Sequence, residues 1–175
     1  MTATDEQQFP PALAAALAVP LDYRDGDGVD FEPFSAFLSA EDTTDWFQAW
    51  TGNAELSGDD FRVFGQDGAG GYAAFWTTRP DRPLTEQPVV FLGSEGETGV
   101  IARDLGAFLW LLAAGFGPRE AATPDAPGWT PRPDHGLTAV AERFAADHRQ
   151  PAADIIGQAT REFPDFDDII MELCA

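Results

Sequence analysis

Residues 61–78 have the sequence FRVFGQDGAGGYAAFWTT, and residues 88–115 have the sequence PVVFLGSEGETGVIARDLGAFLWLLAAG. Short runs of β-branched and aromatic residues alternate here with glycine-rich turns, which is the pattern of adjacent antiparallel strands. Asp104 is expected to cap the helix that follows it. This helix is apolar on nearly every side, so we expect it to be buried against the sheet. The pattern predicts four strands, at 61–64, 71–78, 88–92 and 99–102. The apolar run VVFL in the third strand is expected to be buried on both faces or central in the sheet.

Helices are expected on both sides of this segment in the chain. A short helix should end at Pro20, and residues 33–52 have helical spacing that is interrupted near Ser39. The sequence therefore predicts one α+β domain over residues 1–175, with a mixed, mostly antiparallel sheet flanked by N-terminal, crossing and C-terminal helices. Apolar residues at helical spacing predict the three C-terminal helices, near 137–144, 151–163 and 166–173, with Pro151 at the start of the second.

Two segments differ from this core. We expect residues 1–8 to be frayed. Residues 116–136 contain five prolines and are predicted to form a long loop, which is uncommon in a compact domain unless it is functional or mobile. Trp129 in this loop is either an anchor for a partner protein or a contact that fixes the loop to the body of the protein.

The charge of the chain is strongly one-sided. Thirty acidic residues face ten basic ones, all arginine, which gives a net charge of −20 at pH 7. Such a chain should be repelled by nucleic acid and by anionic membranes, and it should attract basic proteins. The same composition also fits the coding bias of a GC-rich genome, so the charge alone leaves two explanations open.

The sequence favours a cytoplasmic location. The single cysteine, Cys174, cannot form an internal disulfide, which suits a reducing compartment. The N-terminus lacks the basic and apolar segments of a signal peptide. The longest apolar run, residues 107–114, is shorter than the roughly 20 residues that a membrane span needs.

The chain contains no set of residues that predicts catalysis. Its two histidines, His135 and His148, form no zinc-binding or nucleophile-activating pattern. Asp25, Asp27 and Asp30 stand beside glycines, but the spacing fails at both ends of a calcium loop, so a solvated turn is favoured. We expect a protein that is not an enzyme and has no cofactor or metal site. The alternative in this class is an acidic metal-binding or hydrolase module built on this aspartate loop.

Four segments of the chain follow one another in a characteristic order. A glycine-rich hairpin is followed by a proline-led strand that ends in Leu-Gly-Ser-Glu-Gly, and then by a short strand that leads into a helix. The segments are GQDGAGGYAAFW at 65–76, PVVFLGSEGE at 88–97, VIARDLGAFL at 100–109 and AADIIGQATREFPDFD at 152–167. Their order resembles the SMI1/KNR4, or SUKH, superfamily. The resemblance covers more than half of the chain, and residues 1–58 and 116–136 lie outside it.

The resemblance implies both a fold and a role. The fold is α+β, with helices before, across and after the sheet. Bacterial members of this superfamily are mostly immunity proteins that bind and silence a cognate toxin of the same cell, often a nuclease, whereas fungal members regulate cell-wall synthesis and signalling. We therefore predict a non-enzymatic immunity protein for a polymorphic toxin that is basic. The alternative is an intracellular regulatory or scaffold protein with no toxin partner.

The resemblance supplies no site residues, so the predicted contacts rest on position and charge. Acidic residues in the predicted turns would attract the positive surface of a nuclease. Each of them, taken singly, also fits a solvated loop residue. The predicted partner-binding residues are Asp59, Asp60, Asp67, Glu95, Glu97 and Trp129.

Overall fold

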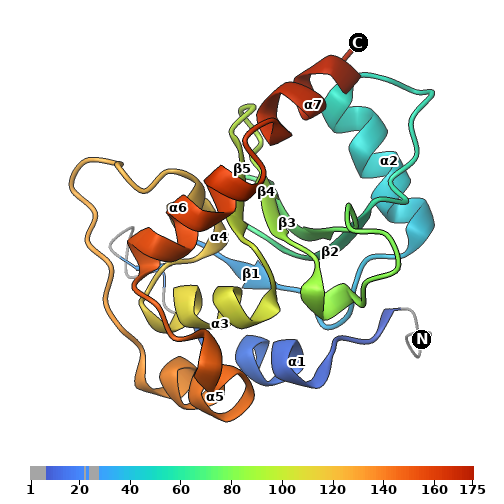
Figure 1. The fold of residues 1–175 in the computed structure, drawn as a ribbon. Coiled ribbons are helices and arrows are strands. Elements are labelled where there is room, and N and C mark those ends of the chain that lie inside the picture. The colour runs from blue at the N-terminus through green and yellow to red at the C-terminus, as the bar shows by residue number, and fades with distance from the viewer. Residues whose placement is uncertain (1–6, 22, 24–27) are drawn as a thin grey trace.

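The computed structural model describes residues 7–21, 23 and 28–175, and Figure 1 shows its elements. Short 3₁₀ turns at Leu84–Glu86 and Ala146–His148 accompany the helices and strands. In chain order, the helices and strands are α1 (Pro11–Leu17), β1 (Glu32–Pro33), α2 (Ala40–Thr51), β2 (Phe61–Gln66), β3 (Tyr72–Trp76), β4 (Val89–Leu92), β5 (Thr98–Ala102), α3 (Leu105–Ala113), α4 (Pro118–Ala122), α5 (His135–Ala145), α6 (Ala152–Glu162) and α7 (Phe166–Leu173).

The five strands form one sheet in sequence order, β1-β2-β3-β4-β5. Every neighbouring pair is antiparallel, and the β2–β3 hairpin places Phe61 opposite Trp76 and Gln66 opposite Tyr72. All four residues of β4 are buried, as expected for a strand that lies between two others. The prediction of a single α+β domain with a mostly antiparallel sheet is confirmed.

One face of the sheet is covered by α1, α3 and α5, which lie below the sheet in Figure 1. Eight of the nine residues of α3 are buried, because α3 packs between the sheet and α5. Asp104 caps this helix as predicted, and its side chain accepts a hydrogen bond from the Ala107 amide at 2.8 Å. The largest fully buried side chains of this layer are Phe37, Phe64, Phe75, Phe91, Phe108 and Leu111.

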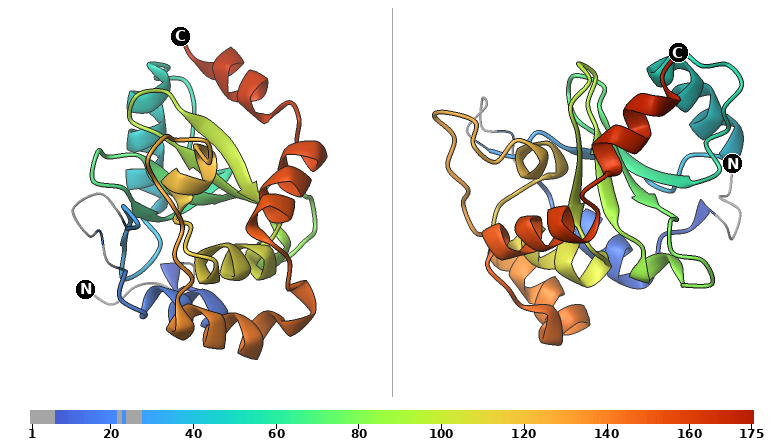
Figure 2. Two further views of the ribbon diagram at one scale, coloured as in Figure 1. Left: turned by 90° about the vertical axis from the view of Figure 1, so that its left-hand side faces the viewer. Right: turned by 45° about the horizontal axis from the view of Figure 1, so that its top comes forward.

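The opposite face is covered by α2 and α7, whose apolar residues pack on Phe61, Val63 and Val90 of the sheet. Helix α6 passes along the edge strand β5, as both views of Figure 2 show. It contributes Ile155 to the first core and Ala159 to the second. The outer edge of β5 is therefore partly covered, which limits pairing with other chains.

The N-terminal half differs from its prediction in two places. The helix expected over 33–52 begins only at Ala40, where Ser39 caps it by accepting a hydrogen bond from the Asp42 amide at 3.0 Å. Pro33 instead lies in β1, a two-residue edge strand, a position that suits a residue without an N–H. Gln7 lies in the segment expected to fray, yet it accepts a hydrogen bond from the Phe37 amide at 2.8 Å.

The predicted loop over 116–136 contains a helix. Pro118 opens α4 directly after Gly117, which is a favoured place for proline, and α5 begins at His135. The irregular part is therefore residues 123–134, called the strap below. Over the residues that the structure describes, no helix has the length and apolarity to cross a membrane.

Candidate functional site

The predicted acidic contact residues lie at opposite ends of the sheet. Asp59 and Asp60 precede β2, and the Asp60 carbonyl accepts a hydrogen bond from the Thr77 amide at 2.8 Å. The turns at 67–71 and 93–97 lie at the other end, side by side, because β3 and β4 are paired neighbours. The six residues of β2 separate the two ends by roughly 20 Å. The predicted acidic surface is therefore divided in two.

Asp67 is buried, with 5% of its surface exposed. Its Oδ1 accepts hydrogen bonds from the amides of Ala69 at 3.0 Å and Gly71 at 2.7 Å, which closes the β2–β3 turn. Its Oδ2 faces Nε of Arg119 at 3.9 Å. The carboxylate thus stabilises the turn from within and offers almost no surface to a partner.

Glu95 and Glu97 share the β4–β5 turn but differ in exposure. Glu95 is exposed, whereas Glu97 folds back, and its Oε2 accepts a hydrogen bond from the Glu95 amide at 3.0 Å. The indole of Trp50 donates a hydrogen bond to the Gly93 carbonyl at 2.7 Å, which fixes the turn to α2. Of the predicted turn carboxylates at this end, Glu95 is the one most open to solvent.

The first turn of α7 adds three exposed carboxylates beside this turn. Asp167 accepts a hydrogen bond from the Thr98 hydroxyl at the start of β5. Acidic residues are favoured in the first turn of a helix by the helix dipole. We use the name "acidic end" for this surface, which consists of Glu95, Glu97, Asp165, Asp167 and Asp168.

Trp129 fixes the strap to the body of the protein. Its indole Nε1 donates a hydrogen bond to the Gly28 carbonyl at 2.9 Å, and its ring meets the Phe116 ring edge-on with centroids 5.2 Å apart. Trp129 therefore makes the contact within the chain that the second interpretation describes, and its role as a partner anchor stays a prediction. The indole is half-buried, and its remaining surface lines two cavities that share Trp129 and Gly28.

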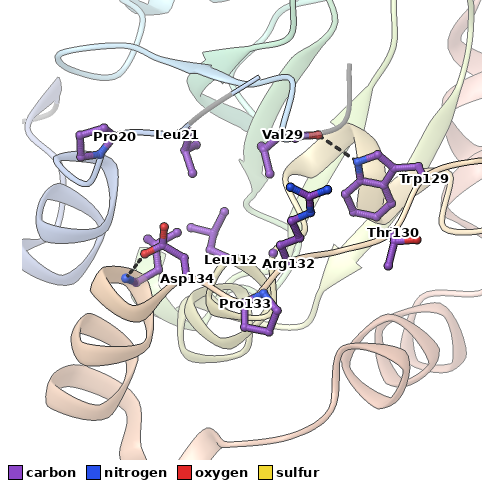
Figure 3. A pocket seen from close by; sticks show the side chains of 12 residues that line it. Pro20, Leu21, Val29, Leu112, Trp129, Thr130, Arg132, Pro133 and Asp134 are labelled. Carbon is purple, nitrogen blue, oxygen red and sulfur yellow. Dashed lines mark hydrogen bonds between the residues drawn. The ribbon is translucent and has the colours of Figure 1, made fainter. Parts of the chain in front are cut away.

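The first cavity measures about 100 Å³ and is lined by both apolar and polar residues. Figure 3 shows Leu21, Val29 and Leu112 directed toward it, with the strap residues Arg132 and Asp134 at its border. Asp134 caps α5, because its Oδ1 accepts a hydrogen bond from the Leu137 amide at 2.8 Å. This cavity is small and lacks a cluster of reactive groups.

The second cavity, called the acidic cavity below, measures about 220 Å³. Asp30 contributes a carboxylate whose Oδ1 accepts from the Gly68 amide and whose Oδ2 accepts from Nη1 of Arg119, both at 2.8 Å. The cavity thus adjoins the β2–β3 turn at the same end of the sheet as the acidic end. The residues that line it are Tyr23, Gly28, Asp30, Arg119, Glu120, Thr123, Ala126 and Trp129.

Glu120 is the most unusual residue of the acidic cavity. Only 9% of its surface is exposed, and its Oε1 has no hydrogen-bond partner among the described residues. Its Oε2 lies 3.5 Å from the Asp30 amide. Burial is the main cause that raises the pKa of Glu120 to about 7, and the charge of Asp30 adds to it, while hydrogen bonds from the Asp30 and Glu120 amides and the charge of Arg119 oppose it. A carboxyl group of this kind changes its charge near neutral pH.

Sequence reasoning did not identify Glu120, and it assigned Asp30 to a solvated turn. Asp30 and Arg119 are 89 residues apart, so no local pattern connects them. The calcium alternative rested also on Asp25 and Asp27, which lie outside the described residues. Within the described part of the chain, no group of three or more histidine, cysteine or acidic side chains could hold a metal ion.

Comparisons with protein-family models, with curated proteins and with solved structures found no match for this chain. The resemblance to the SMI1/KNR4 superfamily thus stays a prediction from the sequence. The function has to be argued from the charge and the geometry of the chain itself.

Proposed function

We propose that this protein is a non-enzymatic immunity protein that binds and neutralises a basic toxin of the same cell, such as a nuclease. The observation that carries the proposal is the net charge of −20 on a folded domain. A toxin that acts on nucleic acid needs a positive surface, and a strongly negative protein is steered toward such a surface and covers it.

The internal ion pairs strengthen this argument. At least five of the ten arginines already pair with carboxylates of the same chain, so their charges are compensated locally. The acidic end, in contrast, carries exposed carboxylates from a β-turn and a helix start that lie side by side. The arginines in these pairs are Arg79, Arg82, Arg103, Arg119 and Arg149.

Capture followed by a toxicity assay tests the proposal. The protein serves as bait in a lysate of its native host, and bound proteins are eluted with a salt gradient. We expect one dominant basic partner that is released only at high salt. That partner should stop growth when it is expressed alone, and co-expression of this protein should restore growth.

The alternative, a regulatory or scaffold protein without a toxin partner, predicts a different result. It would give several weak partners that elute at low salt, and none of them would be toxic. Under that outcome, the acidity would reflect the composition of the genome. A single partner that is toxic but whose toxicity is unaffected by co-expression would also contradict the immunity proposal.

A further inference from the structure

We propose that the outer edge of β5 receives an extended segment of a basic protein partner, which adds to the sheet as a further short strand. This inference rests on the proposed function in one respect, because the partner is taken to be basic. It names the kind of contact that the partner makes, main chain against main chain, which the charge of the chain does not specify.

The hydrogen-bond pattern of the sheet directs the backbone of two β5 residues away from β4. The Gly93 amide donates to the Glu97 carbonyl at 2.6 Å, so these two residues form a hydrogen-bonded pair at the β4–β5 turn. Hydrogen-bonded and non-hydrogen-bonded pairs alternate along an antiparallel ladder. Thr98 and Val100 lie one and three positions farther along this ladder, so their N–H and C=O groups point to the outer edge.

These outward groups are left without partners in the part of the chain that the structure describes. β5 is the last strand of the sheet, and no hydrogen bond of the described residues reaches the backbone of Thr98 or Val100 from the outer side. Only 7% of the surface of Val100 is exposed, and unpaired backbone groups at such a position are rare in folded proteins. Donors and acceptors on alternate residues are what an extended chain would pair with.

A groove of about 240 Å³ lies against this edge. Helix α4 forms one wall, where a side-chain carbon on Gly99 would lie 3.6 Å from that of Ala122. Helix α6 and the start of α7 form the other wall, and both α4 and α6 pack beside β5 (Figure 2). The cover of the edge is therefore partial, and the walls admit a short segment of about three residues, which spans roughly 10 Å. The groove is lined by Thr98, Gly99, Val100, Ala121, Ala122, Pro124, Ile156, Thr160, Phe163, Pro164, Phe166 and Asp167.

The lining of the groove indicates the chemistry of the segment. Its walls consist mostly of alanine, proline, isoleucine and phenylalanine, which suit small apolar side chains. Asp167 is exposed, and it is the one charged side chain among the described residues that line the groove. Glu95 and Glu97 follow in the turn before Thr98. A lysine or arginine at this end of the segment would be attracted by these carboxylates.

A second copy of this chain suits the edge less well than a basic partner does. Open strand edges can pair with one another, and two copies could meet in this way. Each copy carries a net charge of −20, however, and the carboxylates of the acidic end would be brought close to those of the other copy. A basic partner converts this repulsion into attraction.

A basic peptide, acetyl-Arg-Val-Thr-Val-Arg-amide, tests the proposal on the intact protein, whose backbone amide signals are followed by NMR. We expect the amide signals of Thr98 and Val100 to move downfield, as a new hydrogen bond requires, and to saturate with a Kd on the order of 1 mM. The amide of Gly99 points toward β4 and should shift less. The acidic peptide acetyl-Glu-Val-Thr-Val-Glu-amide should bind at least about tenfold more weakly.

Thr98→Pro removes one outward N–H and leaves the ladder to β4 intact, because proline is tolerated on an edge strand where its missing N–H faces outward. The matched control is Thr98→Val, which keeps the N–H and removes the hydroxyl that donates to Asp167. We expect Thr98→Pro to raise the Kd of the basic peptide by about tenfold and Thr98→Val to leave it nearly unchanged. If Thr98→Pro does not fold, the amide shifts of the native protein decide.

Four results would overturn the proposal. The first is the absence of a saturable shift at Thr98 and Val100, and the second is an equal Kd for the two Thr98 variants. The third is equal binding of the acidic peptide, which would exclude a basic segment. The fourth is a shift of the same two signals with protein concentration in the absence of peptide, which would show that a second copy occupies the edge.

The two proposals fail separately. Binding of the peptide needs no biological partner, so it tests the edge of β5 alone. A toxic partner in the host together with no peptide binding would remove the strand contact and keep the function. Peptide binding without any toxic partner would do the opposite.

Discussion

Asp67 and Glu120 are both carboxylates withdrawn from solvent at the same end of the sheet, yet their surroundings differ. Asp67 accepts two backbone hydrogen bonds and faces Arg119, so its charge is well compensated. Glu120 has a long contact to the Asp30 amide and an interaction with its own amide, and its Oε1 has no hydrogen-bond partner among the described residues. The first carboxylate should therefore stabilise the fold, and the second should cost stability whenever it is ionised.

Glu120→Gln tests this difference through pH. The pKa of Glu120 is raised from 4.5 to about 7, so the folded state keeps the proton that the unfolded state has already lost. The contribution of Glu120 to the free energy of unfolding should therefore fall as pH rises from 4.5 to 7, by about 3 kcal/mol in total. The variant lacks this loss. Urea unfolding at pH 4.5 and pH 8 should show a relative gain for the variant only at pH 8.

The comparison uses the difference between the two proteins, so contributions from all other carboxylates cancel. The Glu172→Gln variant serves as a control, because Glu172 is exposed and its removal should give the same small difference at both pH values. A gain for Glu120→Gln that is identical at pH 4.5 and pH 8 would contradict the assigned cause.

Asp67→Ala tests the opposite case. The amides of Ala69 and Gly71 would lose their acceptor inside a tight turn, which should reduce the free energy of unfolding by about 1–3 kcal/mol. Asp59→Ala, at an exposed position at the other end of β2, should change it by less than about 0.5 kcal/mol. Equal losses for the two variants in urea unfolding would show that the hydrogen bonds of Asp67 contribute no more to the free energy of unfolding than an exposed carboxylate does.

At the scale of elements, local signals predicted the long parts of the fold and failed for the short ones. The cap at Asp104 and the buried run 89–92 carry their signals in neighbouring residues, and both predictions are confirmed. Strand β1 has two residues and α4 has five, too few to show a period, and packing against distant segments supports them. The same limit applies to the acidic cavity, because its residues come from segments far apart in the chain.

The strap gives a prediction at this scale. Trp129→Phe keeps the ring contact with Phe116 and removes the hydrogen bond to the Gly28 carbonyl. Amide exchange within residues 123–134 should become about five- to tenfold faster, while the melting temperature of the domain should change little, because the strap lies outside the sheet and its two cores.

Trp50→Phe is the matched control for the strap. It removes an indole hydrogen bond of similar length, to the Gly93 carbonyl, and should speed exchange in residues 93–97 alone. Unchanged exchange across the strap of the Trp129→Phe variant would mean that other contacts hold it. The hydrogen bond from the Asp134 amide to the Ala113 carbonyl is the first of these to examine.

At the scale of the whole molecule, the sheet separates two acidic surfaces that the sequence did not distinguish. Both arise from loops of one sheet, but Asp59 and Asp60 precede β2 at one end, whereas Glu95 and Glu97 connect β4 to β5 at the other end. The net charge of the chain follows from its composition. The division of the acidic residues between two ends of the sheet follows only from the order of the strands. A partner of ordinary interface size covers roughly 800 Å² on each side, so it would centre on one end.

The association rate with a captured basic partner should distinguish the two ends. If steering by charge governs binding, the on-rate should fall by about tenfold or more between low salt and 0.5 M salt, because salt screens the attraction.

Two double variants change the net charge equally, Glu95→Lys with Glu97→Lys and Asp59→Lys with Asp60→Lys. A purely global effect would slow both by the same factor. We expect the first variant to bind several-fold more weakly, with a shallower salt dependence, because the β4–β5 turn adjoins α7 and the acidic cavity. A greater loss for the second variant would place the interface at the opposite end of the sheet, and an on-rate independent of salt would exclude steering altogether.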